Sequence, residues 1–567
     1  MINSKYKKQI EIFNLTILIF SSFFINFYFG HQGLMPLDDL QNFSSGYRVL
    51  TGDFPFKDYY SITGPILDIW QSIIYKTLGV SWSSLVIHSS ILNVLYTLII
   101  YFFLRSHNFQ IFHTFFYSLS AGILMYPPAG NPTVEHHSLI ISLIAFIFFI
   151  IGLKKDNNYY LFLSPFFFTI AFFIKQVPTS YFIIFTIIIY FSQIYKKIDL
   201  INFKVLTSSS LISLFIISLY FFINKVSIEL FFNQYVIIAM DLGESRFNQV
   251  SLSHIHENIS KLFFLLFLLI PSFVFFIKGN KKNSFIILFG LSFIICFYEI
   301  HSNNQPITFA LLPFFLGLLH NDLSINIAKS KFTEYFFYII ISYAFFRILR
   351  FEFYYFYIYL FILIFLFLFN KKFFKNKLKY LNFLFVIYLA ITTSFYYEKY
   401  VKIRAWDDLK KDDLQGSFKG EQIDIIFKNL NWKTINFQDS NLEKQTINEL
   451  LIYLKTLDEN YNYIMITDYQ IYNAILNRKN FSPVKYWFVG ATYPHINNPN
   501  RNEFEIFFKN KIINNNIQEI MIDGSANFNE NDLNEFKWLA TCLLRNKDYS
   551  FKNENIKIYK IKKNCIN

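Results

Sequence analysis

The sequence predicts a mainly α-helical, polytopic membrane protein with a small α/β domain at its C-terminal end. Hydrophobic residues make up 54% of the 567 residues and charged residues only 16%, a composition that the surface of a water-soluble domain of this length would not tolerate. The apolar residues gather in segments of bilayer length, and the chain turns polar after Tyr400.

Apolar segments long enough to cross a bilayer as helices recur along the first 400 residues. About thirteen spans are expected, at residues 12–30, 83–104, 111–128, 138–153, 159–175, 179–195, 205–224, 261–277, 283–300, 306–320, 332–349, 354–370 and 380–397. Lysine clusters such as those at 154–155, 196–197 and 371–379 all fall on one side in this count. Because cytoplasmic loops concentrate Lys and Arg, we expect a cytoplasmic N-terminus, an outer C-terminal domain and a bacterial inner membrane.

The basic surplus of the chain does not indicate a nucleic-acid partner. There are 52 Lys and Arg against 39 Asp and Glu, a formal net charge of +13. The lysines stand at the ends of apolar spans and form no continuous basic face. We therefore expect membrane lipids around the chain and no nucleic acid.

The composition divides the chain into residues 1–400, which carry the spans, and residues 401–567, a polar part expected to form a soluble α/β domain. Helices are predicted over 441–455, 470–477 and 530–545, and strands over 463–467, 519–523 and 556–561. Cys296 lies in a predicted span. Cys542 and Cys565 lie in the polar part, where the sequence is compatible with a disulfide and with two free thiols.

The segment 31–82, expected as an outer loop between the first two spans, carries an unusual density of charge. Asp38, Asp39, Asp53 and Asp58 fall within about twenty positions beside apolar spans. Carboxylates at a bilayer surface are costly unless they are paired or functional, so this loop is the first candidate for chemistry.

Further polar groups map to the same outer side, at Glu135-His136-His137, Lys175-Gln176, the loop 229–246 and the loop that begins at His301. Each also has a structural interpretation. A lysine at a helix end commonly extends towards the interface, and the loop of His301 reads as a solvated turn. Adjacent histidines on a helix point about 100° apart, which disfavours a metal site built from Glu135, His136 and His137 alone.

The order of these motifs resembles the GT-C-type membrane glycosyltransferases, the superfamily of protein O-mannosyltransferases and lipid A aminoarabinose transferases. The resemblance rests on a short basic N-terminus, one span, the acidic pair Asp38-Asp39, then Gly52-Asp-Phe-Pro55-Phe-Lys-Asp58 and Gly64-Pro65. Phe173-Ile-Lys175-Gln176 also resembles a motif of bacterial members. Together these motifs cover the first two hundred residues, and the plan of spans followed by an outer domain agrees with the superfamily.

The resemblance implies transfer of a hexose or pentose from a polyprenyl-phosphate donor to an extracytoplasmic lipid, polysaccharide or protein. It makes Asp38 and Asp39 the catalytic pair, with Asp38 as the base. Asp39, where a glutamate is more common, and Asp58 have positioning roles. The lysine that aminoarabinose transferases carry before Pro-Pro-Leu is absent here, where the chain reads Thr63-Gly64-Pro65-Ile66. Candidates for binding the phosphate or substrate are then Arg48, Lys57, Lys175, Gln176, Glu135, His136 and His301, with Lys175 favoured.

No organic cofactor is expected from the resemblance, and a divalent metal ion is left open because some members of the superfamily use one. Two other classes of function also fit a chain with many spans. A lipid or polysaccharide transporter should show internal pseudo-symmetry with matched broken helices, a pattern not evident in this sequence. A non-catalytic scaffold of the cell envelope would not need the Asp38 cluster.

Overall fold

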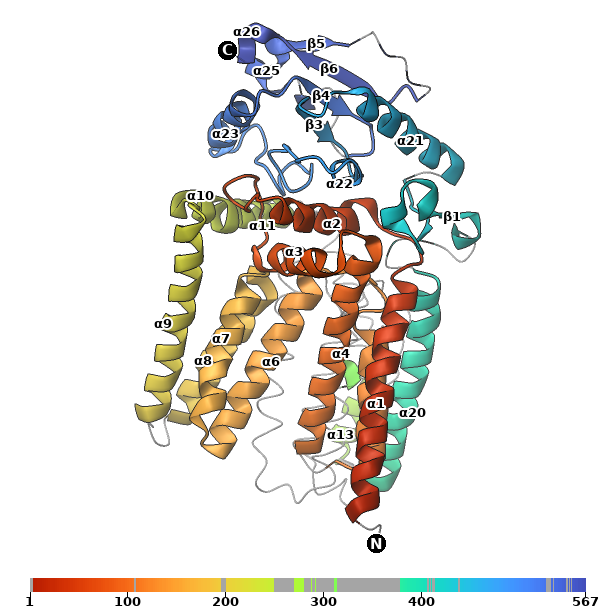
Figure 1. The fold of residues 1–567 in the computed structure, drawn as a ribbon. Coiled ribbons are helices and arrows are strands. Elements are labelled where there is room, and N and C mark those ends of the chain that lie inside the picture. The colour runs from red at the N-terminus through yellow and green to blue at the C-terminus, as the bar shows by residue number, and fades with distance from the viewer. Residues whose placement is uncertain are drawn as a thin grey trace.

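The structure has three layers, which are upright helices, helices lying across their upper ends, and a C-terminal part built on a small sheet (Figure 1). This computed structural model describes residues 4–106, 109–194, 200–248, 270–279, 378–404 and most of 407–566, together with positions 287, 291 and 311–313. The N-terminus and the C-terminal sheet lie at opposite ends of the upright helices (Figure 1).

Eight helices of the described ranges match eight of the predicted spans. They are α1 (Ser4–Phe29), α4 (Trp82–Ser106), α5 (Ile111–Leu124), α6 (Val134–Lys155), α7 (Asn158–Phe172), α8 (Gln176–Ile194), α9 (Leu200–Ile223) and α20 (Leu378–Tyr396). Helix α13 (Ile270–Ile277) covers the end of the span predicted over 261–277. The spans predicted over 283–300, 306–320, 332–349 and 354–370 lie almost wholly outside the described residues, so the count of thirteen stays a prediction.

Four segments within the described ranges are long and apolar enough to cross a bilayer, namely Lys8–Phe29, Trp82–Ser106, Val134–Leu153 and Ile201–Ile223. Large apolar side chains such as Phe20, Phe102 and Phe222 point outwards from these helices and are exposed. A water-soluble protein would bury such residues, whereas lipid accepts them. The chain is therefore an integral membrane protein.

Buried amides hold the first upright helices together. The Nδ2 atom of Asn26 on α1 donates to Ser89 Oγ of α4 at 2.9 Å. The Nδ2 atom of Asn93 on α4 donates to the carbonyl oxygens of Ser22 and Gly122, each at 2.8 Å. Between apolar helices in lipid, small residues and interhelical hydrogen bonds of this kind supply the specificity of packing.

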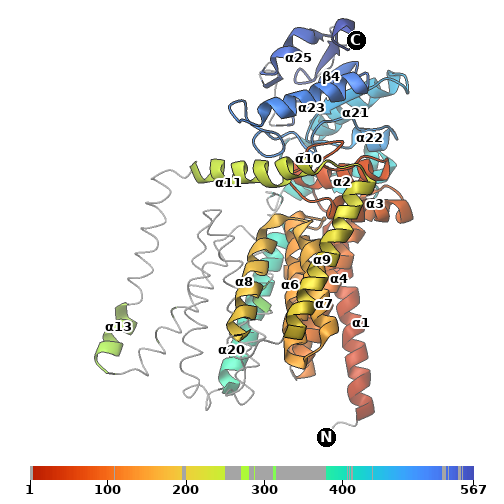
Figure 2. The same ribbon diagram turned by 90° about the vertical axis from the view of Figure 1, so that its left-hand side faces the viewer.

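The segment 31–82 is mostly helical and is no irregular loop. Helices α2 (Pro36–Leu50) and α3 (Ile66–Leu78) lie across the upper ends of the upright helices (Figures 1 and 2). Pro36 at the first position and Asp38 and Asp39 in the first turn favour the start of α2, since proline needs no N–H there and acidic residues interact well with the helix dipole. Gly79, with φ of +84°, ends α3.

A second group of helices lies in the same layer. Helix α10 (Ile228–Phe232), the π-helical turn η1 (Asn233–Ile237) and α11 (Ile238–Asn248) follow α9 and run across its upper end (Figure 2). Asn233 donates to Glu503 at 2.7 Å, and Asp241 accepts from Asn498 at 2.7 Å. These contacts join the layer to the C-terminal part.

The C-terminal part contains a four-stranded sheet in the order β3-β4-β6-β5. Its strands are β3 (Tyr463–Ile466), β4 (Glu519–Ile522), β5 (Leu543–Arg545) and β6 (Lys557–Ile561). Strands β3 and β4 are parallel, with Ile464 opposite Ile520, and the other two pairs are antiparallel. Because side chains alternate along a strand, Met465 packs in one core with Leu450, while Ile464 packs in another with Phe508.

The two helices that cover these faces are α21 (Ser440–Thr456), which was predicted, and α23 (Arg501–Asn514), which was not. The helix predicted over 470–477 is the short α22 (Tyr472–Ile475), and that over 530–545 is wrong in its last turn, where α25 (Lys537–Cys542) gives way to β5. The remaining elements are the π-helical η3 (Tyr397–Lys402), the 3₁₀ turns η5 (Asp413–Gly416), η6 (Gly420–Gln422) and η7 (Ile425–Phe427), the paired β1 (Phe418–Lys419) and β2 (Asn431–Trp432), and α26 (Lys563–Ile566).

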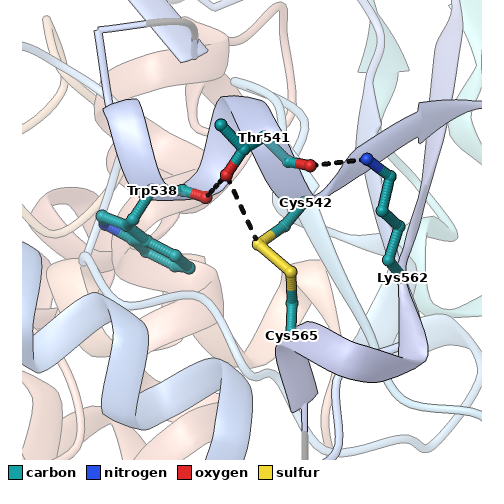
Figure 3. Close-up of a disulfide and its surroundings, with 5 residues drawn as sticks. All are labelled: Trp538, Thr541, Cys542, Lys562 and Cys565. Atoms are coloured by element: carbon teal, nitrogen blue, oxygen red, sulfur yellow. Dashed lines mark hydrogen bonds between the residues drawn. A yellow bond between two sulfur atoms is a disulfide. The ribbon is translucent and has the colours of Figure 1, made fainter.

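Cys542 and Cys565 form a disulfide, which decides between the two alternatives of the sequence (Figure 3). It ties the end of α25 to α26. Beside it, Lys562 Nζ donates to the carbonyl oxygen of Thr541 at 2.6 Å. Disulfides persist in oxidising compartments and are rare in the cytosol.

One hydrophobic core crosses the division expected near residue 400. Phe43 of α2 and Trp82 of α4 pack in the same cluster as Phe427, Trp432 and Ile447. The C-terminal part therefore shares buried surface with the layer of lying helices.

Candidate active site at the upper end of the helices

Asp38 and Asp39 are neighbours in the first turn of α2, yet their surroundings differ. Asp38 is exposed, and its Oδ1 accepts a hydrogen bond from Gln41 Nε2 at 3.3 Å. Asp39 is only 4% exposed, and its Oδ2 accepts from the backbone N–H of Met35 at 2.9 Å. Adjacent residues of a helix point about 100° apart, so that one carboxylate faces solvent and the other faces the protein.

Asp39 belongs to a buried group of charges. Burial and the nearby carboxylate of Asp407 raise the pKa of Asp39 well above its usual range, against the smaller lowering effects of the Met35 hydrogen bond and of Arg404. Arg404 is fully buried, pairs with Asp407 at 2.8 Å and donates to the carbonyl oxygens of residues 127–129. Asp39 thus lies where α2, the α5–α6 loop and the chain after α20 meet.

Arg48, a candidate for the phosphate, is buried between α2 and the C-terminal part. All three of its nitrogens donate to protein oxygens, among them Asp53 Oδ2 at 3.1 Å, Ser482 O at 2.9 Å and Val484 O at 3.2 Å. Its guanidinium also lies 4.1 Å from the centre of the Tyr59 ring. Through these contacts, Arg48 holds α2 and the C-terminal part together.

Asp53 and Asp58 also have structural partners. Asp53 is buried and forms a second ion pair, with Lys479 at 3.2 Å. Asp58 Oδ2 accepts from the backbone N–H of Phe54 at 2.8 Å, which closes a tight turn. Lys57 in this turn is exposed. Of the four aspartates of the segment, Asp38 alone is exposed.

A buried ion pair that the sequence did not predict joins the same two layers. Lys485 Nζ lies 2.7 Å from Asp68 Oδ1, and both side chains are 1% exposed. Ser45 Oγ donates to Asp68 Oδ1 at 2.8 Å, and Tyr59 OH donates to Asp68 Oδ2 at 3.0 Å. An acidic residue in the first turn of α3 was visible in the sequence, whereas nothing marked its partner 417 residues away.

The structure pairs two residues of separate predicted motifs. Lys175 Nζ lies 2.7 Å from Glu135 Oε1, with side chains 23% and 19% exposed. The loop that leads to Glu135 also touches the helix of Asp38, since Asn42 Nδ2 donates to the carbonyl oxygen of Pro132 at 2.9 Å. The loop between α5 and α6 therefore contacts α2 at Asn42 and leads to the partner of Lys175.

The motifs Thr63-Gly64-Pro65 and Phe173-Ile-Lys175-Gln176 pack directly on each other. The backbone N–H of Gly64 donates to Ile174 O at 3.0 Å, and Gln176 Nε2 donates to Ile62 O at 3.0 Å. A Cβ atom at Gly64 would lie 1.8 Å from the carbonyl oxygen of Phe173. Glycine is required there by the close approach of two backbones.

Replacing Gly64 with alanine should therefore prevent these two turns from packing. We expect a loss of about 3 kcal/mol or more of folding stability, because a rigid backbone atom stands where the methyl group would go. Thermal unfolding of the purified protein in detergent measures the effect. Gly243→Ala is the matched control, since nothing lies within 4 Å of its added Cβ, and an unfolding temperature unchanged by Gly64→Ala would contradict the packing.

Two further candidates are histidines. His136 is buried on α6 with its Nδ1 2.5 Å from Thr133 Oγ1. His301 lies outside the described residues. Within the described ranges, no three side chains of His, Cys, Asp or Glu are arranged to hold a metal ion.

Comparison with known proteins finds no matching protein-family profile and no matching curated sequence. The solved structures that are similar to this chain include two of ArnT. ArnT from Cupriavidus metallidurans in the apo state has 9% sequence identity and a TM-score of 0.41 over 97% of this chain and 98% of that one. ArnT bound to undecaprenyl phosphate has 9% identity and a TM-score of 0.40 over 98% and 99%. At this similarity, ArnT assigns no role to any residue here.

Proposed function

We propose that the chain is an inverting membrane glycosyltransferase, which moves a sugar from a polyprenyl-phosphate donor to an extracytoplasmic acceptor. The observation that carries the proposal is the exposed carboxylate of Asp38, on a helix that lies between the upright helices and the C-terminal part. The motifs around it are those that resemble the GT-C glycosyltransferases. Sites at such junctions can draw residues from distant parts of a chain.

In the proposed reaction Asp38 acts as the general base. Its carboxylate takes the proton of an acceptor hydroxyl as that oxygen attacks the anomeric carbon, and the bond from this carbon to the phosphate oxygen breaks. The polyprenyl phosphate leaves with the bonding electrons. Attack from the face opposite the phosphate inverts the anomeric centre.

Lys175 is the cation that we assign to the leaving phosphate. It lies between α7 and α8 with its side chain 23% exposed, and a cation at the outer end of a span suits a lipid-linked phosphate. We assign Arg48, Asp53 and Asp58 to the scaffold instead, because their side chains are already engaged by protein groups.

Lys175→Gln should raise the donor KM by about tenfold to a hundredfold, because a hydrogen bond to a charged group contributes roughly 1.5–3 kcal/mol. Lys175→Arg keeps the charge and should retain most of the affinity. Initial rates at varied donor concentration give the values. An unchanged donor KM in Lys175→Gln would remove this residue from the phosphate site.

We further propose that the C-terminal part and the upper layer face the outside of a bacterial inner membrane, with the N-terminus in the cytoplasm. The positions of the lysine clusters support this orientation, and the Cys542–Cys565 disulfide suits an oxidising compartment. Residues 1–400 would then hold the catalytic membrane domain, and residues 401–567 an outer domain docked on it.

Washed membranes that contain the chain, supplied with a labelled polyprenyl-phosphate sugar, test the proposal against its rivals. An enzyme converts the donor to polyprenyl phosphate and a new labelled product. A transporter moves the label without breaking the donor bond, and a scaffold does neither. Membranes from cells without the chain are the control.

A further inference from the structure

A small cavity lined mainly by polar side chains lies in the C-terminal part, at the end of β3. Its wall includes Thr467, Gln470, Tyr472, Asn473, Asn480 and Ser482. The Nδ2 atom of Asn480 donates to Ser44 Oγ of α2 at 3.3 Å, so the cavity adjoins the helix that carries Asp38. The space inside has room for about one water-sized group.

Several polar atoms of this wall have no hydrogen-bond partner among the described residues. They are both side-chain polar atoms of Gln470, the Oδ1 of Asn473 and the hydroxyl of Tyr472. Gln470 and Asn473 are each only 9% exposed, and Tyr472 is 1% exposed. A buried polar group without a partner costs about 1–3 kcal/mol, so a wall of this kind is expensive for folding alone.

The carboxyl group of Asp468, which is next to the wall residue Thr467 in the chain, is influenced by the charge of Asp38. Asp468 follows Thr467 at the end of β3, and its Oδ1 also has no partner within the described chain. Burial, the Asp523 carboxyl and the charge of Asp38 raise the pKa of Asp468 to about 7. Near neutral pH this carboxyl group can therefore both donate and accept a hydrogen bond.

The chemistry of the wall selects the class of ligand. Its unpartnered atoms include donors and acceptors, which suits a hydroxyl group because a hydroxyl both donates and accepts. The wall contains neither Lys nor Arg among its described residues, so a phosphate is not favoured. The size of the space admits one hydroxyl and excludes a whole sugar ring.

We propose that this cavity is a carbohydrate subsite that binds one hydroxyl group of the glycosyl acceptor or of the transferred sugar. The inference rests on the proposed function, because the sugar is a substrate of the proposed reaction. It gives the C-terminal part a direct role in selecting the substrate. Gln470 and Asn473 are the residues that read the hydroxyl.

The test measures how the purified full-length protein binds methyl glycosides of hexoses and pentoses, and their monodeoxy analogues, by ligand-observed NMR. A site that hydrogen-bonds a hydroxyl rejects the analogue that lacks it. We expect one glycoside to bind at least tenfold more tightly than one of its deoxy analogues, and Gln470→Met to abolish this difference. Gln445→Met, on the exposed face of α21, should leave it intact.

Thermal unfolding separates a binding role from a structural one. Since Gln470→Met removes unpartnered buried polar atoms, its unfolding temperature should equal or exceed that of the unsubstituted protein. A lower temperature, the same preference among deoxy analogues in Gln470→Met, or no glycoside binding at all would each overturn the subsite.

Competition identifies the source of the hydroxyl. Displacement of the glycoside by a polyprenyl-phosphate sugar, and not by polyprenyl phosphate, would assign it to the transferred sugar, and no displacement by either would assign it to the acceptor. If the protein consumes no donor and yet distinguishes the deoxy analogues, the proposed function fails and the subsite stands.

Discussion

Asp38→Asn is expected to lower the rate of sugar transfer by about 100-fold or more, because a general base contributes about 10²–10⁴-fold to such reactions. The amide has nearly the shape of the carboxylate but cannot take the proton of the acceptor. Since Asp38 is exposed and its Oδ1 accepts a hydrogen bond at 3.3 Å from Gln41, which an amide oxygen can also accept, folding should be unaffected. Initial rates with a labelled donor, alongside thermal unfolding, measure both quantities.

Two further variants serve as comparisons for Asp38→Asn. Asp39→Asn should have a much smaller effect on the rate, because the Asp39 carboxyl group is buried and its pKa is raised, and an amide oxygen can still accept from Met35 N–H. Asp156→Asn, at the far end of α6 in the left-handed conformation that Asn adopts readily, is the surface control. Equal losses in Asp38→Asn and Asp39→Asn would argue against Asp38 as the base.

Asp68→Asn is expected to cost about 3–5 kcal/mol of folding stability. It leaves the Lys485 ammonium buried without a carboxylate, in a place where both side chains are 1% exposed. Thermal unfolding in detergent should show the loss. Limited proteolysis should show that the C-terminal part is released from α2 and α3.

The double variant Asp68→Asn/Lys485→Met tests the reason for this loss. It removes the uncompensated charge, so part of the stability should return. Glu398→Gln breaks the exposed pair with Lys402, both side chains 58% exposed, and should change stability by less than about 0.5 kcal/mol. If Asp68→Asn unfolded at the temperature of Glu398→Gln, the ion pair would not hold the layers together.

Hydropathy predicted the upright helices well because a helix that crosses a bilayer must consist mostly of apolar residues along its whole length. Eight predicted spans are helices in the structure, with ends that agree to within about five residues except at the start of α1, which begins eight residues earlier than predicted. Helices α2 and α3 were harder to predict because they are short and their buried positions include polar residues such as Asp39, Arg48 and Asp68. Such helices have neither the length nor the overall hydrophobicity of a span.

The sequence singled out Asp38 and Lys175 as candidate site residues. It did not indicate which residues contact the other candidates. Asp38 and Lys175 stood out because a charge beside a bilayer is unusual. The aspartate cluster, however, combined two purposes, since Asp53 and Asp58 hold the scaffold while Asp38 faces solvent. Contacts between residues more than 400 positions apart determine the roles of Arg48, Asp68 and Lys485. A local sequence pattern cannot predict such contacts.

A structure with bound polyprenyl phosphate tests the central claim most directly. We predict that the phosphate lies within about 3 Å of Lys175 Nζ. The Asp38 carboxylate should then lie across from the phosphate, on the other side of the position that the anomeric carbon would occupy. A phosphate bound away from Lys175, with the Lys175–Glu135 pair unchanged and Asp38 remote from the lipid, would contradict it.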